Sequence, residues 1–143
     1  MLRGLWKGWK GIRSKRKENK ISVIIERPVK EVFEFTTNPK NTSLWIDSII
    51  EEVLEGYPPM VGSVYKNRGE DSEWDSYKVL EFEQNKIFTL GDLDRNYHVR
   101  YTYVDLGDDR TEMEYFEWIK DGDLSKPFTE DILLKLKEVI ENN

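Results

Sequence analysis

The side chains of this chain that could do chemistry are carboxylates, hydroxyls and one imidazole. The sequence contains no cysteine and a single histidine, His98. These counts exclude disulfides, thiolate nucleophiles, thiolate zinc sites and sites built from several histidines. Neither a glycine-rich phosphate motif nor the spacing of a calcium loop occurs. We therefore expect no metal and no cofactor, which leaves acid–base chemistry or binding without chemistry.

Glu117 is the sharpest candidate for acid–base chemistry. Alternation along segment 110–120 places Met113, Tyr115 and Glu117 on one face, whereas the opposite register would bury Phe116 and Trp118. We favour the first register, and a bulge at Tyr115 and Phe116 would explain why both faces carry aromatic rings. A carboxylate facing an apolar pocket could donate or accept a proton. The alternative, which we favour, is a carboxylate at the rim that pairs with a lysine or faces water.

Aromatic side chains dominate the positions expected to face a ligand. In segment 96–105, Tyr97, Tyr101 and Tyr103 share one face, and His98 falls on the other. His98 is therefore expected outside the sheet rather than as a general base. The side chains expected to line a ligand site are Trp45, Tyr65, Asn67, Tyr77, Phe88, Tyr97, Tyr101, Tyr103, Met113, Tyr115, Leu133 and Leu136. Any one ring would serve equally in an ordinary core, and only several rings facing one void would favour a ligand.

The elements that must position these side chains follow a simple order. A β-branched run at 20–26 predicts a strand, and Pro28 then opens a short helix that ends before Pro39. A second short helix is expected at 42–48, capped by Thr42 or Ser43. Strand-like segments separated by turn signals follow at 48–56, 62–70, 73–83, 86–91, 96–105 and 110–120. Helical spacing after Thr129 predicts a terminal helix of about 14 residues.

Charge divides the 143 residues unequally. Residues 1–20 hold eight basic and one acidic residue (+7), and the other residues hold 14 basic and 27 acidic ones (−13). We expect residues 1–19 to form a basic amphipathic or flexible arm and residues 20–143 to form one ligand-binding domain. The arm suits weak contact with a membrane surface or nucleic acid, although a frayed tail is the preferred interpretation, and no specific DNA binding is expected. No apolar run long enough to span a bilayer and no secretion signal is found, so the cytoplasm is the expected location.

The order of elements and several stretches resemble the START-like (SRPBCC) superfamily between about Lys20 and Ile140. The stretches are "ISVIIERPVKEVFEF", "TTNPKNTSLWID", "PPMVGSVYK" and "YKVLEFEQNKIFTL". The resemblance implies an α+β helix-grip fold, in which a curved antiparallel sheet of about seven strands wraps around a C-terminal helix. It also implies a pocket between sheet and helix for a hydrophobic small molecule such as a lipid, quinone or polyketide-like compound.

Three functions stay open, because the superfamily includes carriers, receptors and enzymes. The preferred one is non-catalytic binding of a hydrophobic or aromatic small molecule. The second is a cyclase or dehydratase that uses Glu117, Tyr101, Tyr65 and His98 as acids or bases. The third is a module that docks a protein, ribosome or membrane through the basic arm or the outer face of the sheet.

Overall fold

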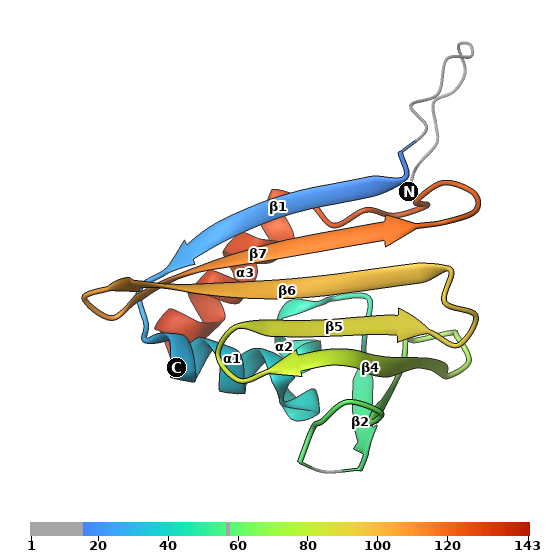
Figure 1. Ribbon diagram of the computed structural model, residues 1–143, viewed down its shortest axis with the longest axis horizontal. Helices are drawn as coiled ribbons and strands as arrows, with labels where there is room; N and C mark the ends of the chain where they lie inside the picture. The colour runs from blue at the N-terminus through green and yellow to red at the C-terminus, as the bar shows by residue number, and fades with distance from the viewer. Residues whose placement is uncertain (1–15, 57) are drawn as a thin grey trace.

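The fold is a seven-stranded antiparallel sheet with helices on one face (Figure 1). The computed structural model describes residues 16–56 and 58–143. The elements are β1 (Glu18–Ile25), α1 (Val29–Thr37), a 3₁₀ turn η1 (Pro39–Asn41), α2 (Thr42–Trp45), β2 (Glu51–Glu55), β3 (Val64–Arg68), β4 (Asp75–Glu83), β5 (Ile87–Asp92), β6 (Tyr97–Gly107), β7 (Arg110–Ile119) and α3 (Glu130–Glu141). The expected order of elements, the seven strands and the α+β helix-grip architecture are confirmed.

The strand order explains how the first and last strands close one side of the sheet. The order is β1-β7-β6-β5-β4-β3-β2, so β2 to β7 form a meander and β1 returns to pair with β7. Figure 1 shows α3 behind β1, β7 and β6, with α1 and α2 at the lower side of the sheet. The basic arm predicted at 1–19 lies largely outside the described residues; within them, β1 begins at Glu18. None of the helices in the described part of the chain is long and apolar enough to cross a bilayer.

Two prolines set the limits of α1. Pro28 stands at the N-cap in an extended conformation, and Asn38 is extended again immediately before Pro39. The helix N-cap of α2 differs from the prediction: it is Asn41, and its side chain makes no capping bond. Thr42 is the first residue of the helix, and its hydroxyl donates to Glu52 rather than to the helix backbone.

The terminal helix α3 buries one face against the sheet. It has 12 residues, two fewer than predicted, which corresponds to about 18 Å of length. Leu133, Leu136 and Ile140 are almost fully buried. They share the core with Trp45 and Met113, so this part of the space between sheet and helix is filled by side chains.

The register of β7 is regular, and the bulge proposed at Tyr115 and Phe116 was wrong. Pairing with both β1 and β6 runs without a shift through these residues, and the irregularity in β6 and β7 lies at Asp105 to Gly107. The expected inward register is correct. The rings on the outer face lie under cations, Lys20 over Phe116 and Arg100 over Trp118.

Candidate functional site

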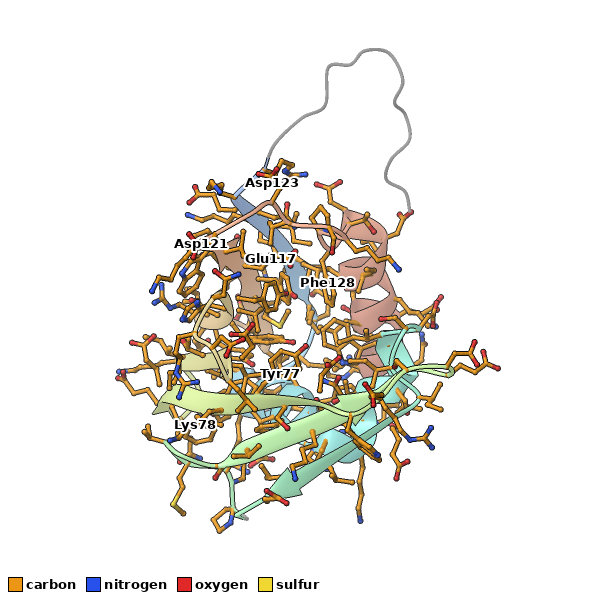
Figure 2. All side chains as sticks on the ribbon, turned by 90° about the vertical axis from the view of Figure 1, so that its right-hand side faces the viewer. Tyr77, Lys78, Glu117, Asp121, Asp123 and Phe128 are labelled. Carbon is orange, nitrogen blue, oxygen red and sulfur yellow. The ribbon has the colours of Figure 1, made fainter. Side chains whose placement is uncertain are left out.

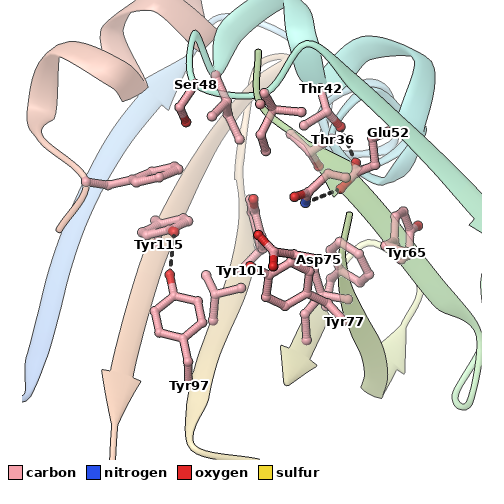
Figure 3. A pocket seen from close by; sticks show the side chains of 18 of the residues that line it. Thr36, Thr42, Ser48, Glu52, Tyr65, Asp75, Tyr77, Tyr97, Tyr101 and Tyr115 are labelled. Atoms are coloured by element: carbon pink, nitrogen blue, oxygen red, sulfur yellow. Dashed lines mark hydrogen bonds between the residues drawn. The ribbon is translucent and has the colours of Figure 1, made fainter. Parts of the chain in front are cut away.

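A cavity of about 300 Å³ opens on the concave face of the sheet (Figure 3). Its floor comes from β3 to β7, and its other walls come from the α2 to β2 segment and from Phe128, just before α3. Five tyrosines and two phenylalanines line it: Tyr65, Tyr77, Phe88, Tyr97, Tyr101, Tyr115 and Phe128. Several rings thus face one void, the arrangement that favours a ligand over simple core packing.

Seven of the twelve predicted site residues line this cavity, and five do not. Those that line it are Tyr65, Asn67, Tyr77, Phe88, Tyr97, Tyr101 and Tyr115. Those that belong instead to the buried core are Trp45, Tyr103, Met113, Leu133 and Leu136. The cavity therefore lies beside the α2 to β2 segment rather than directly under α3, because the two leucines and their large neighbours fill the space beneath that helix.

Ring contacts hold the aromatic walls in place. Phe128 stacks on Tyr115 with centroids 4.3 Å apart, and Tyr115 meets Tyr101 edge to face at 5.3 Å. Phe88 continues the row, 5.5 Å from Tyr101 and 5.4 Å from Tyr65. Such pairs are geometrically specific, so each ring restricts the next and the cavity is shaped before any ligand enters.

The tyrosine hydroxyls in the cavity fall into two groups. The Tyr65 hydroxyl donates to the Thr37 carbonyl at 2.6 Å, and that of Tyr97 donates to Glu117 at 2.7 Å. In contrast, the hydroxyls of Tyr77 and Tyr101 make no hydrogen bond to any described residue. Burial, helped by nearby carboxylates, raises the pKa of Tyr77 to about 12, and burial raises the pKa of Tyr101 well above its usual value. Both hydroxyls are therefore protonated at neutral pH and available to a ligand.

Two carboxylates in the cavity were not predicted. Glu52, from β2, accepts hydrogen bonds from Thr42 Oγ1 at 2.5 Å and Asn67 Nδ2 at 3.1 Å. Burial raises the pKa of Glu52, although these two bonds oppose the effect. Asp75, at the start of β4, is exposed at the cavity mouth. Strict alternation along β2 would have placed Glu52 and Leu54 on the inner face, so the signal was present in the sequence.

Glu117 does not line the cavity, and the expectation of a rim carboxylate was wrong. It is 2% exposed, and its oxygens accept hydrogen bonds from Asn19 Nδ2 at 2.9 Å, the Phe128 N–H at 2.7 Å and the Tyr97 hydroxyl. Figure 2 shows Glu117 and Phe128 in the interior. No lysine pairs with it among the described residues. Its carboxylate joins β1, β6 and the segment before α3, and thereby holds two of the cavity's rings.

His98 lies on the outer face of the sheet, as the alternation predicts. Its ring stacks on that of Trp118 with centroids 4.8 Å apart and planes 3° from parallel. Desolvation lowers the pKa of His98, and the cations of Lys120 and Arg95 lower it further, whereas the carboxylate of Asp92 raises it. His98 is thus separated by the sheet from the concave face that carries the cavity.

Comparison with known proteins assigns the architecture. No family model matches the sequence, and no curated protein matches it. A START superfamily protein from Mycobacterium smegmatis aligns over 88% of this chain and 98% of its own, with a TM-score of 0.70 and 14% identity. The Aha1 dimer from Colwellia psychrerythraea covers 87% and 96%, with a TM-score of 0.62 and 14% identity. The Polyketide_cyc-like protein Cgl2372 from Corynebacterium glutamicum covers 72% and 65%, with a TM-score of 0.54 and 18% identity. The chain therefore has the START-like helix-grip fold, as the resemblance implied.

Proposed function

We propose that this protein binds a small aromatic or otherwise hydrophobic molecule in the cavity on the concave face of its sheet. The observation that carries the proposal is the enclosure of about 300 Å³ by seven aromatic side chains. If these rings served stability alone, we would expect them to pack against one another and leave no void, because atoms that line a void lose van der Waals contacts. Here the rings instead surround open space.

The volume limits the size of the ligand. The volume of the cavity is about 300 Å³. This is the lower end of the range for ligand pockets. A compound of one or two rings, such as a small quinone or polyketide-like molecule, matches the volume better than a long-chain lipid.

The alternative of a cyclase or dehydratase has less support. The side chains expected to act as acids or bases do not meet: Glu117 is held by three donors behind the cavity wall, and His98 is on the opposite face. Tyr65 donates to a backbone carbonyl, and of these four residues only Tyr101 presents to the cavity a hydroxyl that has no hydrogen bond to another described residue. These placements favour binding over proton transfer by that set.

The alternative of a docking module depends mainly on the basic arm. Residues 1–15 lie outside the described residues, so their contacts with a membrane surface or nucleic acid are untested. Deleting residues 1–15 and measuring liposome and RNA binding would test this alternative.

The binding proposal can be tested with a matched pair of substitutions. Ser48 lines the cavity and is exposed, so Ser48→Trp should fill the space without disturbing the core. Ser43 is an exposed residue of α2 that does not line it, so Ser43→Trp is the control. Neutral two-ring probes such as 2-naphthol and tryptophol would be titrated by calorimetry, with amide chemical shifts of Val99 and Leu90 reporting the site.

The expected result is saturable binding to the wild type and to the Ser43→Trp variant, with at least a tenfold loss of affinity for Ser48→Trp. Absence of binding by every one- or two-ring probe, or binding that is unchanged in Ser48→Trp, would refute the proposal. Native mass spectrometry of protein purified from its own host would then identify any molecule that it retains.

A further inference from the structure

The charged residues that line the cavity, among those described, are all acidic. Glu52 and Asp75 are the charged residues in it, and among the described residues no lysine, arginine or histidine lines the cavity. Figure 3 shows both carboxylates among the side chains that line the pocket. An anionic ligand would therefore meet two carboxylates and no countercharge.

Glu52 differs from the other carboxylates of its strand. Glu51 forms an ion pair with Arg68 at 3.1 Å, and Glu55 forms one with Lys66 at 3.1 Å, both on the outer face of β2. Glu52 lies on the inner face, where its partners Thr42 and Asn67 are neutral. A partly buried carboxylate without a cation is costly, so a cationic group in the cavity would stabilise it.

A second observation, independent of the carboxylates, indicates a polar ligand group. Tyr101 is 6% exposed and lines the cavity, yet its hydroxyl has no hydrogen-bond partner in the described part of the chain. Because Tyr101 lines the cavity, a bound ligand can supply the hydrogen-bond partner that the described residues do not. The Tyr77 hydroxyl, which also lines the cavity, has no partner there either.

We propose that the ligand of this cavity is an aromatic molecule that carries a protonated amine. The ammonium group lies between Glu52 and Asp75, where its N–H groups donate to carboxylate oxygens and to the Tyr101 hydroxyl oxygen. Its aromatic part packs against Phe88, Tyr115 and Phe128. The electron-rich faces of the surrounding rings attract a cation as well, so walls and carboxylates favour the same charge.

The inference rests on the proposed function, because it concerns the same cavity. Three probes of nearly equal size distinguish the amine inference from the proposed function. Tryptamine is cationic, tryptophol is neutral, and indole-3-acetate is anionic. Dissociation constants would be measured by calorimetry at pH 7 and about 0.1 M salt. We expect tryptamine to bind about tenfold more tightly than tryptophol, and indole-3-acetate to bind most weakly.

The variant Glu52→Gln tests the role of the carboxylate. Its amide oxygen can still accept from Thr42, and the Asn67 amide can turn to present its oxygen to the new N–H₂ group. The expected result is a loss of about tenfold in tryptamine affinity with less than a threefold change for tryptophol. Glu51→Gln removes the same charge one residue away on the outer face, so it should leave both affinities within about twofold.

The outcomes distinguish the two proposals. Equal affinities for tryptamine and tryptophol, or an equal effect of Glu51→Gln and Glu52→Gln, would overturn the amine inference and leave binding of aromatic molecules intact. Failure of all three probes to bind would overturn both. If Glu52→Gln does not fold, as judged by circular dichroism, Asp75→Asn is the second variant: it must reduce the preference for tryptamine over tryptophol, and an unchanged preference refutes the inference.

Discussion

Replacing Glu117 tests whether this buried carboxylate is a structural tie. Leucine at this position leaves three donors without their acceptor: the Asn19 amide, the Tyr97 hydroxyl and the Phe128 N–H. Each buried unpaired donor costs about 1–3 kcal/mol. Asn19 also donates to the Phe128 carbonyl, and Tyr97 lies 3.4 Å from the Tyr115 hydroxyl, so both keep partial partners. We therefore expect Glu117→Leu to lower the free energy of unfolding by about 3–5 kcal/mol.

Glu117→Gln should cost less, because only one hydrogen bond changes direction. The Gln oxygen can accept from Asn19 and Phe128, and its N–H₂ group can donate to the Tyr97 hydroxyl. The hydrogen bonds of the new glutamine would lack the negative charge of the carboxylate, so we expect the free energy of unfolding to fall by about 1–3 kcal/mol. Urea unfolding followed by circular dichroism measures both values. Glu114→Leu, three residues away and on the outer face of β7, is the control and should change the value by no more than about 1 kcal/mol.

Unfolding of Glu117→Leu at nearly the same urea concentration as the wild type would refute the structural role of Glu117. Equal destabilisation by Glu117→Gln and Glu117→Leu would also contradict it, because charge rather than hydrogen bonding would then dominate. A further consequence concerns the cavity. Since Glu117 holds Tyr97 and Phe128, Glu117→Leu should weaken ligand binding even where the protein remains folded.

Three further predictions concern the core and the tyrosines. The pKa of about 12 for Tyr77 exceeds the about 10 of an exposed tyrosine, so the folded state holds this proton more tightly. Stability should therefore fall by at least about 1–2 kcal/mol as pH rises from about 10 to about 12, because Tyr101 and other buried tyrosines with a raised pKa add to the loss. Phenolate absorbance with urea unfolding at each pH measures it, and a flat profile contradicts it. Leu136→Ala should cost about 2–5 kcal/mol in urea unfolding because Leu136 is fully buried, whereas Leu134→Ala, at a 54% exposed position, should cost less than about 1 kcal/mol. Tyr103→Phe removes a buried hydroxyl 2.6 Å from Thr36 Oγ1 and should cost about 1 kcal/mol in thermal unfolding; no shift in midpoint would be the contrary result.

Much of the fold could be predicted because its signals are local. Pro28 and Pro39 limit the first helix whatever packs against it, since a proline constrains its own backbone and that of the residue before it. Alternation assigned the inner faces of β6 and β7 correctly, because the period of a strand is exactly two residues and no bulge interrupts these segments at Tyr115. Helix caps were less predictable, since the Thr42 hydroxyl donates to Glu52, ten residues further along the chain, and not to the helix backbone.

The site was predicted only in part, because its position depends on packing between distant elements. Five of the strand tyrosines predicted for the site line the cavity, since alternation places their side chains on the concave face of the sheet. Leu133 and Leu136 were expected beside the ligand but are covered by core side chains, which no local pattern reveals. Glu52 was missed for a different reason: a glutamate is assigned to water by default, and only the alternation of β2 contradicts that assignment.

The two edge strands of the sheet, β1 and β2, have consequences for self-association. An unpaired strand edge can recruit a second chain, and β2 is guarded against this by its short length and three glutamates. At the opposite edge, the Lys137 side chain caps the Ile24 carbonyl of β1. Two of the β2 glutamates, Glu51 and Glu55, form ion pairs with Arg68 and Lys66 of the neighbouring strand β3. A second chain that added a strand at the β2 edge would therefore meet charged side chains on the outer face, which opposes edge-to-edge association.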